Sequence, residues 1–259
     1  METDAKAGPG PGSAAARARG RLPTQLRTLV CERAVLDRAD GSAKWSAEGS
    51  CVLAAVYGPR QARIQREDAE RAVVEVVYKP RAGLQGPEHK ALEAEIRGVL
   101  EGVIPLGLHP RTSIMVVLQV IQEDGSVLAC ALNAAAAALV DAGVPLSSMF
   151  ASVSCALASE GGLLLDPDAA EEQAALARFT FALPYHFDLT TKGAAAKAEA
   201  AEGGGEAVVS SAVLGARCGG DFSPEALLEA LALCRAGCGR VAAFGRLSLA
   251  KSLQALGGQ

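Results

Sequence analysis

Short apolar runs alternate with turn signals along the first part of the chain. Residues 51–57 and 71–78 are rich in Val, Ala and Tyr, and they end at Gly58-Pro59 and Lys79-Pro80. Such runs, stopped by a turn dipeptide, predict buried β-strands. Residues 26–36 alternate loosely before an Asp-Gly pair at 40–41, which predicts a hairpin turn. We therefore expect an antiparallel meander here.

Helical spacing appears after a Gly/Pro-rich loop. Apolar residues at three- and four-residue intervals over 92–103 predict a helix that ends before Pro105. An alanine-dense stretch over 128–141, followed by Gly143 and Pro145, predicts a second helix close against a sheet. Strands are predicted at 113–121, 149–157, 163–166 and 177–183. The order βαβαβ predicts an α/β (α+β) domain with a mixed sheet and helices packed on one face.

The N-terminal end of the chain and one internal stretch contain few large apolar residues that a core could bury. Residues 1–22 are mostly Ala, Gly, Pro and Arg, so we predict a disordered tail before one domain over 23–259. Residues 190–206 are of low complexity and predict a flexible insertion. Residues 207–215 are expected as the last strand. Ser223-Pro224 predicts the start of a helix to about 236, with a second helical stretch to 256.

Composition narrows the class of function. The 259 residues are 50% apolar with a net charge of −4, and the isoelectric point is about 5.5. An acidic chain is a poor free-standing nucleic-acid binder, so any RNA contact must be local. No apolar run reaches the roughly 20 residues of a membrane span. Cys234 and Cys238 lack further ligands for zinc, so they predict a buried helix face. We therefore expect no metal and no cofactor. From the apolar runs we expect no membrane contact.

Three segments, in this order, resemble the RNase PH family. The first includes residues 38–43 (RADGSA) and 52–59 (VLAAVYGP), and the most specific is 108–114 (LHPRTSI), continuing to 138–145 (ALVDAGVP). The third is Leu165-Asp166-Pro167 with 181–183 (FAL) after it. Together they cover about 24–184. Within the family the chain looks most similar to the component-five type of subunit in the eukaryotic RNA exosome ring.

The resemblance implies partners as well as a fold. RNase PH-like exosome subunits form a hetero-hexameric ring with S1/KH cap subunits, around a central channel that carries RNA. A subunit of this kind is expected in the nucleus, nucleolus and cytoplasm, although no localisation motif stands out in the sequence.

The positions that match the family's catalytic site are altered. Active members hold phosphate partly with an arginine in a Gly-Thr-Arg turn at a helix start, and here that turn reads Gly125-Ser126-Val127. A second phosphate arginine would fall near Glu88, where Lys90 is the nearby cation. The two catalytic aspartates match Asp166 and Glu172. A purely structural interpretation makes Asp166 a turn residue and places Glu172, with Glu171, on a solvated acidic face. We therefore predict no catalytic residues, with Val127, Asp166 and Glu172 as vestigial positions.

One loop offers cations for RNA. Arg60, Arg63 and Arg66 follow a predicted strand, and the matching loop of related ring subunits approaches the channel. Pairing with the acidic residues at 67, 68 and 70 is an equally plausible role, and Arg111 is expected to hold a turn. The leading hypothesis is a non-catalytic structural ring subunit that supports 3′-to-5′ RNA processing. The alternatives are an active phosphate-dependent 3′-5′ exoribonuclease and a free homodimeric nucleic-acid-binding protein.

Overall fold

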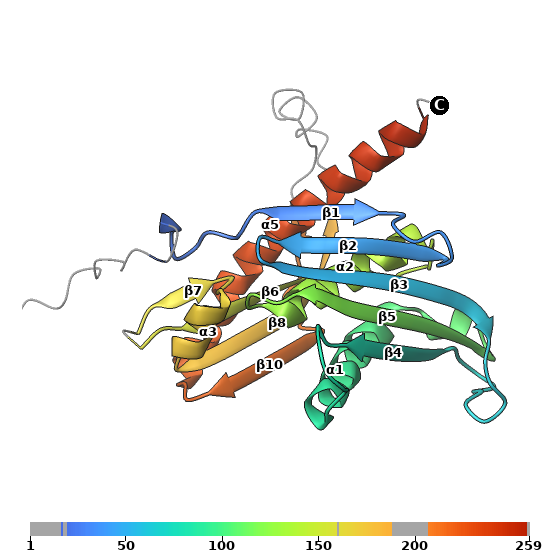
Figure 1. The fold of residues 1–259 in the computed structure, drawn as a ribbon, viewed down its shortest axis with the longest axis horizontal. Helices are drawn as coiled ribbons and strands as arrows, with labels where there is room; N and C mark the ends of the chain where they lie inside the picture. The colour runs from blue at the N-terminus through green and yellow to red at the C-terminus, as the bar shows by residue number, and fades with distance from the viewer. Residues whose placement is uncertain (1–16, 18–19, 160, 188–206, 258–259) are drawn as a thin grey trace, which may run out of the picture.

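Two β-sheets with helices between and beside them make up the domain (Figure 1). The computed structural model describes residues 17, 20–159, 161–187 and 207–257. The predicted α/β class is confirmed, and the order β4-α1-β5-α2-β6 contains the predicted βαβαβ unit. The predicted insertion at 190–206 and most of the predicted tail lie outside the described residues.

The first sheet has five strands in the order β1-β2-β3-β5-β4. All neighbours are antiparallel except β4 and β5, which are parallel because α1 connects them. Buried side chains alternate along each strand, as Val52, Ala54 and Val56 do in β3, so one face of this sheet forms the core. The strands are β1 (Leu29–Arg33), β2 (Gly41–Ala47), β3 (Ser50–Gln61), β4 (Val73–Lys79) and β5 (Thr112–Gln122).

The second sheet has the order β10-β8-β6-β7, and β9 pairs with β8 beyond the end of β10. Its strands are β6 (Met149–Leu157), β7 (Leu163–Leu165), β8 (Ala177–Phe187), β9 (Ala207–Val209) and β10 (Gly215–Gly220). The prediction of one last strand over 207–215 is wrong. Two short strands replace it, and β10 was missed because its exposed sequence GARCGG has no apolar alternation to reveal a strand.

The helix α2 (Val127–Asp141) lies between the two sheets, and it contacts β2 and β3 of the first and β6 and β8 of the second. Ala131, Ala134, Ala135 and Ala138 are fully buried. A helix that is apolar on all sides is buried on all sides, and alanine allows both sheets to approach closely. The helix α1 (Pro87–Val103) packs mainly on β4 and places Ile96, Val99, Leu100 and Val103 in the core.

The C-terminal helix α5 (Pro224–Gly257) is one continuous element, so the predicted interruption near 236 is wrong. A Cβ at Gly237 would lie 3.2 Å from Leu165 and 3.3 Å from Val153. This glycine therefore permits close packing of the helix on the second sheet rather than ending it. Cys234 and Cys238 are fully buried on this face, as predicted.

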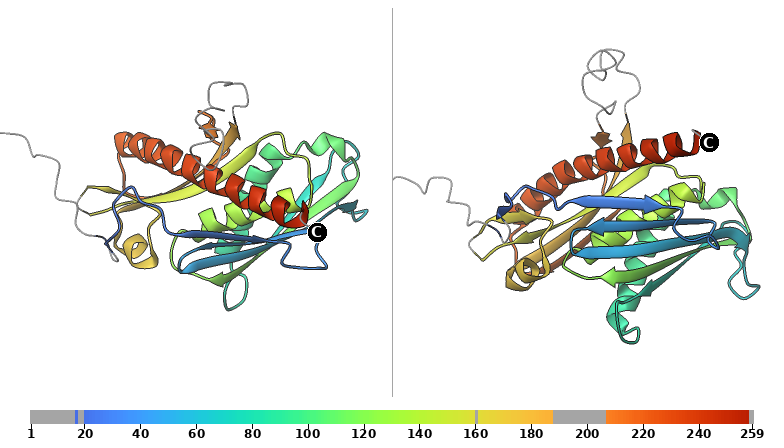
Figure 2. Two further views of the ribbon diagram at one scale, coloured as in Figure 1. Left: turned by 90° about the horizontal axis from the view of Figure 1, so that it is seen from above. Right: turned by 45° about the horizontal axis from the view of Figure 1, so that its top comes forward.

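The helix α5 crosses the second sheet and continues beside β1 (Figures 1 and 2). Ser248 donates a hydrogen bond to the Cys31 carbonyl at 3.4 Å, and Arg33 donates one to the Gly245 carbonyl at 3.3 Å. The helix thus joins the two sheets. No helix among the described residues is long and apolar enough to span a membrane.

Candidate functional site

Asp166 lies directly after β7, in a turn where its φ is 51°. Only 6% of the residue is exposed, and its backbone N–H donates to the Ser154 carbonyl at 2.8 Å. The predicted turn role is therefore confirmed. A buried carboxylate loses the water that would solvate its charge, so it needs a cation and hydrogen-bond donors instead. The neighbours of Asp166 supply both.

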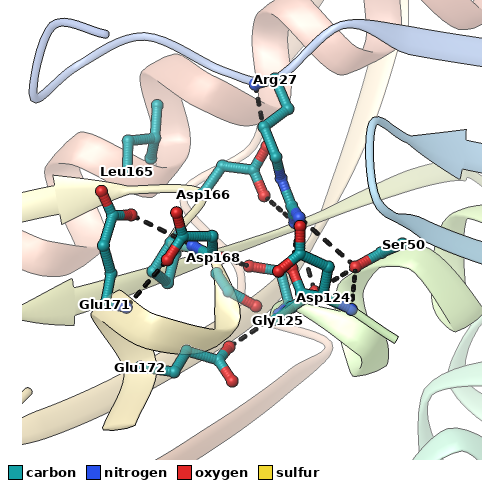
Figure 3. A network of polar contacts seen from close by, with 12 residues as sticks. Arg27, Ser50, Asp124, Gly125, Leu165, Asp166, Asp168, Glu171 and Glu172 are labelled. Carbon is teal, nitrogen blue, oxygen red and sulfur yellow. Dashed lines mark hydrogen bonds and ion pairs between the residues drawn. The ribbon is translucent and has the colours of Figure 1, made fainter. Parts of the chain in front are cut away.

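Arg27 compensates Asp166 from the segment before β1 (Figure 3). Its Nη2 lies 2.7 Å from Asp166 Oδ1, and its backbone N–H donates to Oδ2 at 3.0 Å, so both carboxylate oxygens are engaged. The guanidinium also donates to Ser50 and to the carbonyls of Asp124 and Gly125. Burial lowers the pKa of Arg27, but the hydrogen bond and charge of Asp166 outweigh it and raise that pKa. The result is a closed ion pair that ties β3, the turn before α2 and β7 together.

Two further arginines, from the segment predicted to be a disordered tail, reach the group formed by Asp166, Asp168, Glu171 and Glu172, which we call the acidic cluster. Arg17 makes a two-pronged contact with Glu171 at 2.8 and 2.6 Å and donates to the Leu165 and Asp166 carbonyls. Arg21 lies 3.5 Å from Glu171 and 3.8 Å from Asp168. Both arginines are buried. The ordered domain thus includes Arg17 and residues 20–22, before the predicted boundary at 23.

The short helix α3 (Ala169–Ala174) arranges the remaining acidic residues. Asp168 accepts from the Glu171 N–H at 2.8 Å, and Glu171 accepts in return from the Asp168 N–H at 3.0 Å. This capping box has a recognisable Asp-x-x-Glu signature that the strand-by-strand interpretation overlooked. The expectation that Glu171 and Glu172 form a solvated face is wrong, because both are half-buried and face the cluster.

The turn before α2 completes the site. Gly125 has φ 74°, and a Cβ there would lie 2.5 Å from the Asp168 carbonyl carbon, so only glycine allows the two loops to meet. The Ser126 N–H donates to Glu172 Oε1 at 2.7 Å. Burial raises the pKa of Glu172, although this hydrogen bond opposes the change. Val127 follows, and α2 has no Lys or Arg along its length.

The arrangement has consequences for ligands. Helix N-termini bind anions through free backbone N–H groups, but here a carboxylate of the chain itself already occupies the Ser126 N–H. Asp166 is likewise engaged by Arg27. Within the described residues there is no group of three or more His, Cys, Asp or Glu side chains placed to hold a metal ion. The acidic cluster is thus an internal network of ion pairs and hydrogen bonds between arginines and carboxylates.

The arginine loop, which carries Arg60, Arg63 and Arg66, lies elsewhere. The acidic cluster is at the Ser50 end of β3 and the arginine loop at its Gln61 end, on the order of 35 Å away along the strand. Arg60 pairs with Asp40 at 3.0 Å, and Arg66 pairs with Glu75 at 3.2 Å, rather than with the predicted neighbours at 67, 68 and 70. Arg63 is exposed and has no side-chain partner among the described residues.

The other two basic positions singled out in the sequence have local roles or none. The Arg111 backbone accepts from Ala62 and donates to Asp68, and its guanidinium lies 3.5 Å from Glu67, so it contacts the 62–68 segment and not only the predicted turn at 108–112. Near Glu88, at the start of α1, His89 caps the helix by accepting from the Gly86 N–H at 2.9 Å. Lys90 is exposed and lies in the first turn of α1.

A model of the 3′ exoribonuclease family, domain 1, matches residues 25–145. The exosome complex component RRP46 homolog of Caenorhabditis elegans is 33% identical over 159 residues, which cover 61% of this chain and 73% of that protein. The crystal structure of rice (Oryza sativa) Rrp46 has a TM-score of 0.75 and 35% identity, covering 90% of this chain and 100% of that chain. The chain belongs to the RNase PH family.

A plant relative adds a further similarity. The exosome complex exonuclease RRP46 homolog of Arabidopsis thaliana is 45% identical over 154 residues, 60% of this chain and 64% of that protein. The matched part thus spans slightly less than two thirds of that relative. The Caenorhabditis elegans and Arabidopsis thaliana relatives are both named as exosome proteins, in agreement with the resemblance of the three sequence segments.

Proposed function

We propose that this RNase PH family member is a non-catalytic structural subunit of an RNA exosome ring, supporting 3′-to-5′ RNA processing and degradation. The names of the relatives support membership of the exosome. The contacts within the acidic cluster support the absence of catalysis. Phosphorolysis needs a phosphate ion held beside the scissile phosphate, which requires concentrated positive charge. In this chain, each arginine of the cluster is already paired with a carboxylate or a carbonyl.

The observation that carries the proposal is the contact between Glu172 and the Ser126 N–H at 2.7 Å, next to Val127. A carboxylate sits where the turn would present a backbone donor to an anion, and a valine follows where active members have an arginine. A phosphate there would meet a negative charge in place of a cation. Loss of one charged hydrogen bond alone weakens such binding by about 1.5–3 kcal/mol.

The alternative is an active phosphate-dependent exoribonuclease, which the word exonuclease in the name of the Arabidopsis relative favours. The purified chain is incubated with 3′-labelled RNA, Mg²⁺ and phosphate, beside an active RNase PH as positive control. We expect no phosphate-dependent release of nucleoside diphosphates. Release that requires phosphate would establish the alternative. A Val127→Arg variant that gains release, where the neutral Val127→Gln variant does not, would identify the missing arginine as the cause.

RNA contact is assigned in this proposal to Arg60, Arg63 and Arg66. Arg63 is the best placed, because its guanidinium has no side-chain partner among the described residues, while Arg60 and Arg66 hold exposed ion pairs that contribute little. Exposed pairs of this kind exchange readily for phosphate contacts. This loop borders an RNA channel only in the assembled ring.

The expected partners are other RNase PH-like subunits in a hetero-hexameric ring, S1/KH cap subunits and RNA in the channel. Size-exclusion chromatography of the chain alone and co-expressed with those subunits tests this assembly. We expect a single complex that contains the chain. A homodimer that never enters the complex would favour the free nucleic-acid-binding alternative. Location in nucleus, nucleolus and cytoplasm is tested by imaging the tagged full chain.

A further inference from the structure

A cavity of about 380 Å³ lies beneath α5, where this helix passes from the second sheet toward β1. None of its lining residues belongs to the acidic cluster or to the arginine loop. Its volume falls within the range of about 300–1,000 Å³ that is typical of small-molecule sites. The cavity exists because small residues face it, namely Ala136 and Ala137 of α2 and Gly245 of α5. A Cβ added at Gly245 would meet only the Tyr185 hydroxyl, at 4.0 Å.

The walls of the cavity are apolar and largely aromatic. Trp45, Phe150, Tyr185 and Phe187 line it from three different strands. Tyr185 and Phe187 form an edge-to-face pair with ring centres 5.4 Å apart, which fixes their orientation. Asn133 also lines the cavity, and its side-chain amide donates to the Ser152 carbonyl and accepts from the Ser152 N–H, each at 2.8 Å. Because most of its lining is apolar, the interior favours a ligand with an apolar body.

The charged residues in the described lining of the cavity are two arginines, Arg33 and Arg246. Arg33 has a buried Nε with no hydrogen-bond partner among the described residues, and the Arg246 guanidinium lies 4.7 Å from the centre of the Phe187 ring. Burial raises the pKa of Tyr185 to about 12, so its hydroxyl stays protonated and can donate. None of the lining residues in the described part of the chain is Asp or Glu.

We propose that this cavity binds a small molecule with an apolar body and one anionic group, such as a medium-chain or aromatic carboxylate. The body would lie among the aromatic side chains, and the carboxylate would accept from Arg33. A nucleotide fits less well, because the polar edges of its base would be buried without partners. The inference does not depend on exosome membership.

The methionines of the chain provide the test. There are three, Met1, Met115 and Met149. Met149 lines the cavity, whereas Met115 lies in β5 of the first sheet, outside the lining. The full chain is labelled with ¹³C at the methionine methyl groups and titrated with sodium decanoate, followed by two-dimensional NMR. We expect the Met149 methyl signal to shift saturably, with a dissociation constant of about 1 mM or tighter, while the Met115 signal stays in place.

Variants decide between binding in the cavity and binding elsewhere. Gly245→Leu fills the cavity and should abolish the Met149 shift; Ala137→Leu, which fills it from α2, serves if the first variant does not fold by circular dichroism. Arg33→Gln should weaken decanoate binding by about tenfold or more. Arg38→Gln removes an exposed arginine outside the cavity and should change nothing.

Ligand controls complete the design. Decan-1-ol should bind more weakly than decanoate, and adenosine monophosphate should leave Met149 unshifted. The proposal is overturned if decanoate does not shift Met149, if it shifts Met115 equally, or if Gly245→Leu binds as the unaltered chain does.

Discussion

Asp166→Asn separates a structural carboxylate from a catalytic one. The substitution removes the charge that Arg27 faces at 2.7 Å, and Arg27 has a fully buried side chain. Asparagine tolerates the left-handed backbone at φ 51°, so the change tests the charge and not the turn. Breaking a buried pair from one side costs about 3–5 kcal/mol, because the remaining charge stays buried without its partner.

This cost is large enough to measure by thermal unfolding. For a domain of this size 1 kcal/mol corresponds to roughly 2–4 °C, so we expect the Tm to fall by roughly 6–20 °C. Asp68→Asn is the matched control, because Asp68 pairs with Arg71 at the surface, with 37% of the Asp68 side chain exposed. Its substitution should leave the Tm nearly unchanged, because solvent screens an exposed ion pair.

A double-mutant cycle makes the test specific. Arg27→Met should also destabilise, but the double variant should lose less than the sum of both losses by about 0.5–3 kcal/mol. A Tm for Asp166→Asn within error of the unaltered chain would refute the structural assignment. It would indicate instead a carboxylate that the fold does not need, as is common for catalytic groups.

Three further results are expected. Gly237→Val should lower stability to urea by about 1–3 kcal/mol, because its side chain would press on Leu165 and Val153; equal stability would contradict the packing of α5. Arg17→Gln should lower the Tm at pH 7 but much less at pH 3, since Arg17 holds the pKa of Glu171 below its ordinary 4.5 despite burial. The stability from this pair is complete above 4.5 and is lost as pH falls through the lowered value, so a Tm difference unchanged at pH 3 would exclude it. Arg63→Gln should leave the Tm unchanged and, in the assembled complex, reduce the salt dependence of RNA binding by about one phosphate contact; no change in binding would remove Arg63 from the RNA path.

Sequence reasoning located most of the regular elements but misjudged the features that depend on distant contacts. The periodicity over 92–103 and 128–141 predicted α1 and α2, although α1 begins earlier, at Pro87. Arg17 and Arg21 were assigned to a disordered tail, because nothing near them in sequence indicates a partner. Their partners lie around Leu165 and Glu171, roughly 150 residues away along the chain.

The candidate site shows the same division. Val127, Asp166 and Glu172 were identified from the family resemblance, and their chemical identity alone indicates a weakened phosphate site. That Glu172 binds the Ser126 N–H, and that Arg27 closes on Asp166, required the fold, because these contacts join segments separated by 46 and 139 residues. The apolar cavity beneath α5 could not be predicted from the sequence, since it depends on the small size of Ala136, Ala137 and Gly245 where they meet in the fold.

By itself the sequence determined the α/β class, the strand and helix periods and the family, because these depend on local patterns of apolar residues and on contiguous motifs. Only the tertiary structure decided that the strands divide into two sheets around α2, and that α5 continues through Gly237. It also decided that the acidic cluster is neutralised from within by Arg17, Arg21 and Arg27. The physical reason is that burial and charge pairing are set by which distant residues meet, and a buried carboxylate is stable only where such a meeting supplies its partner.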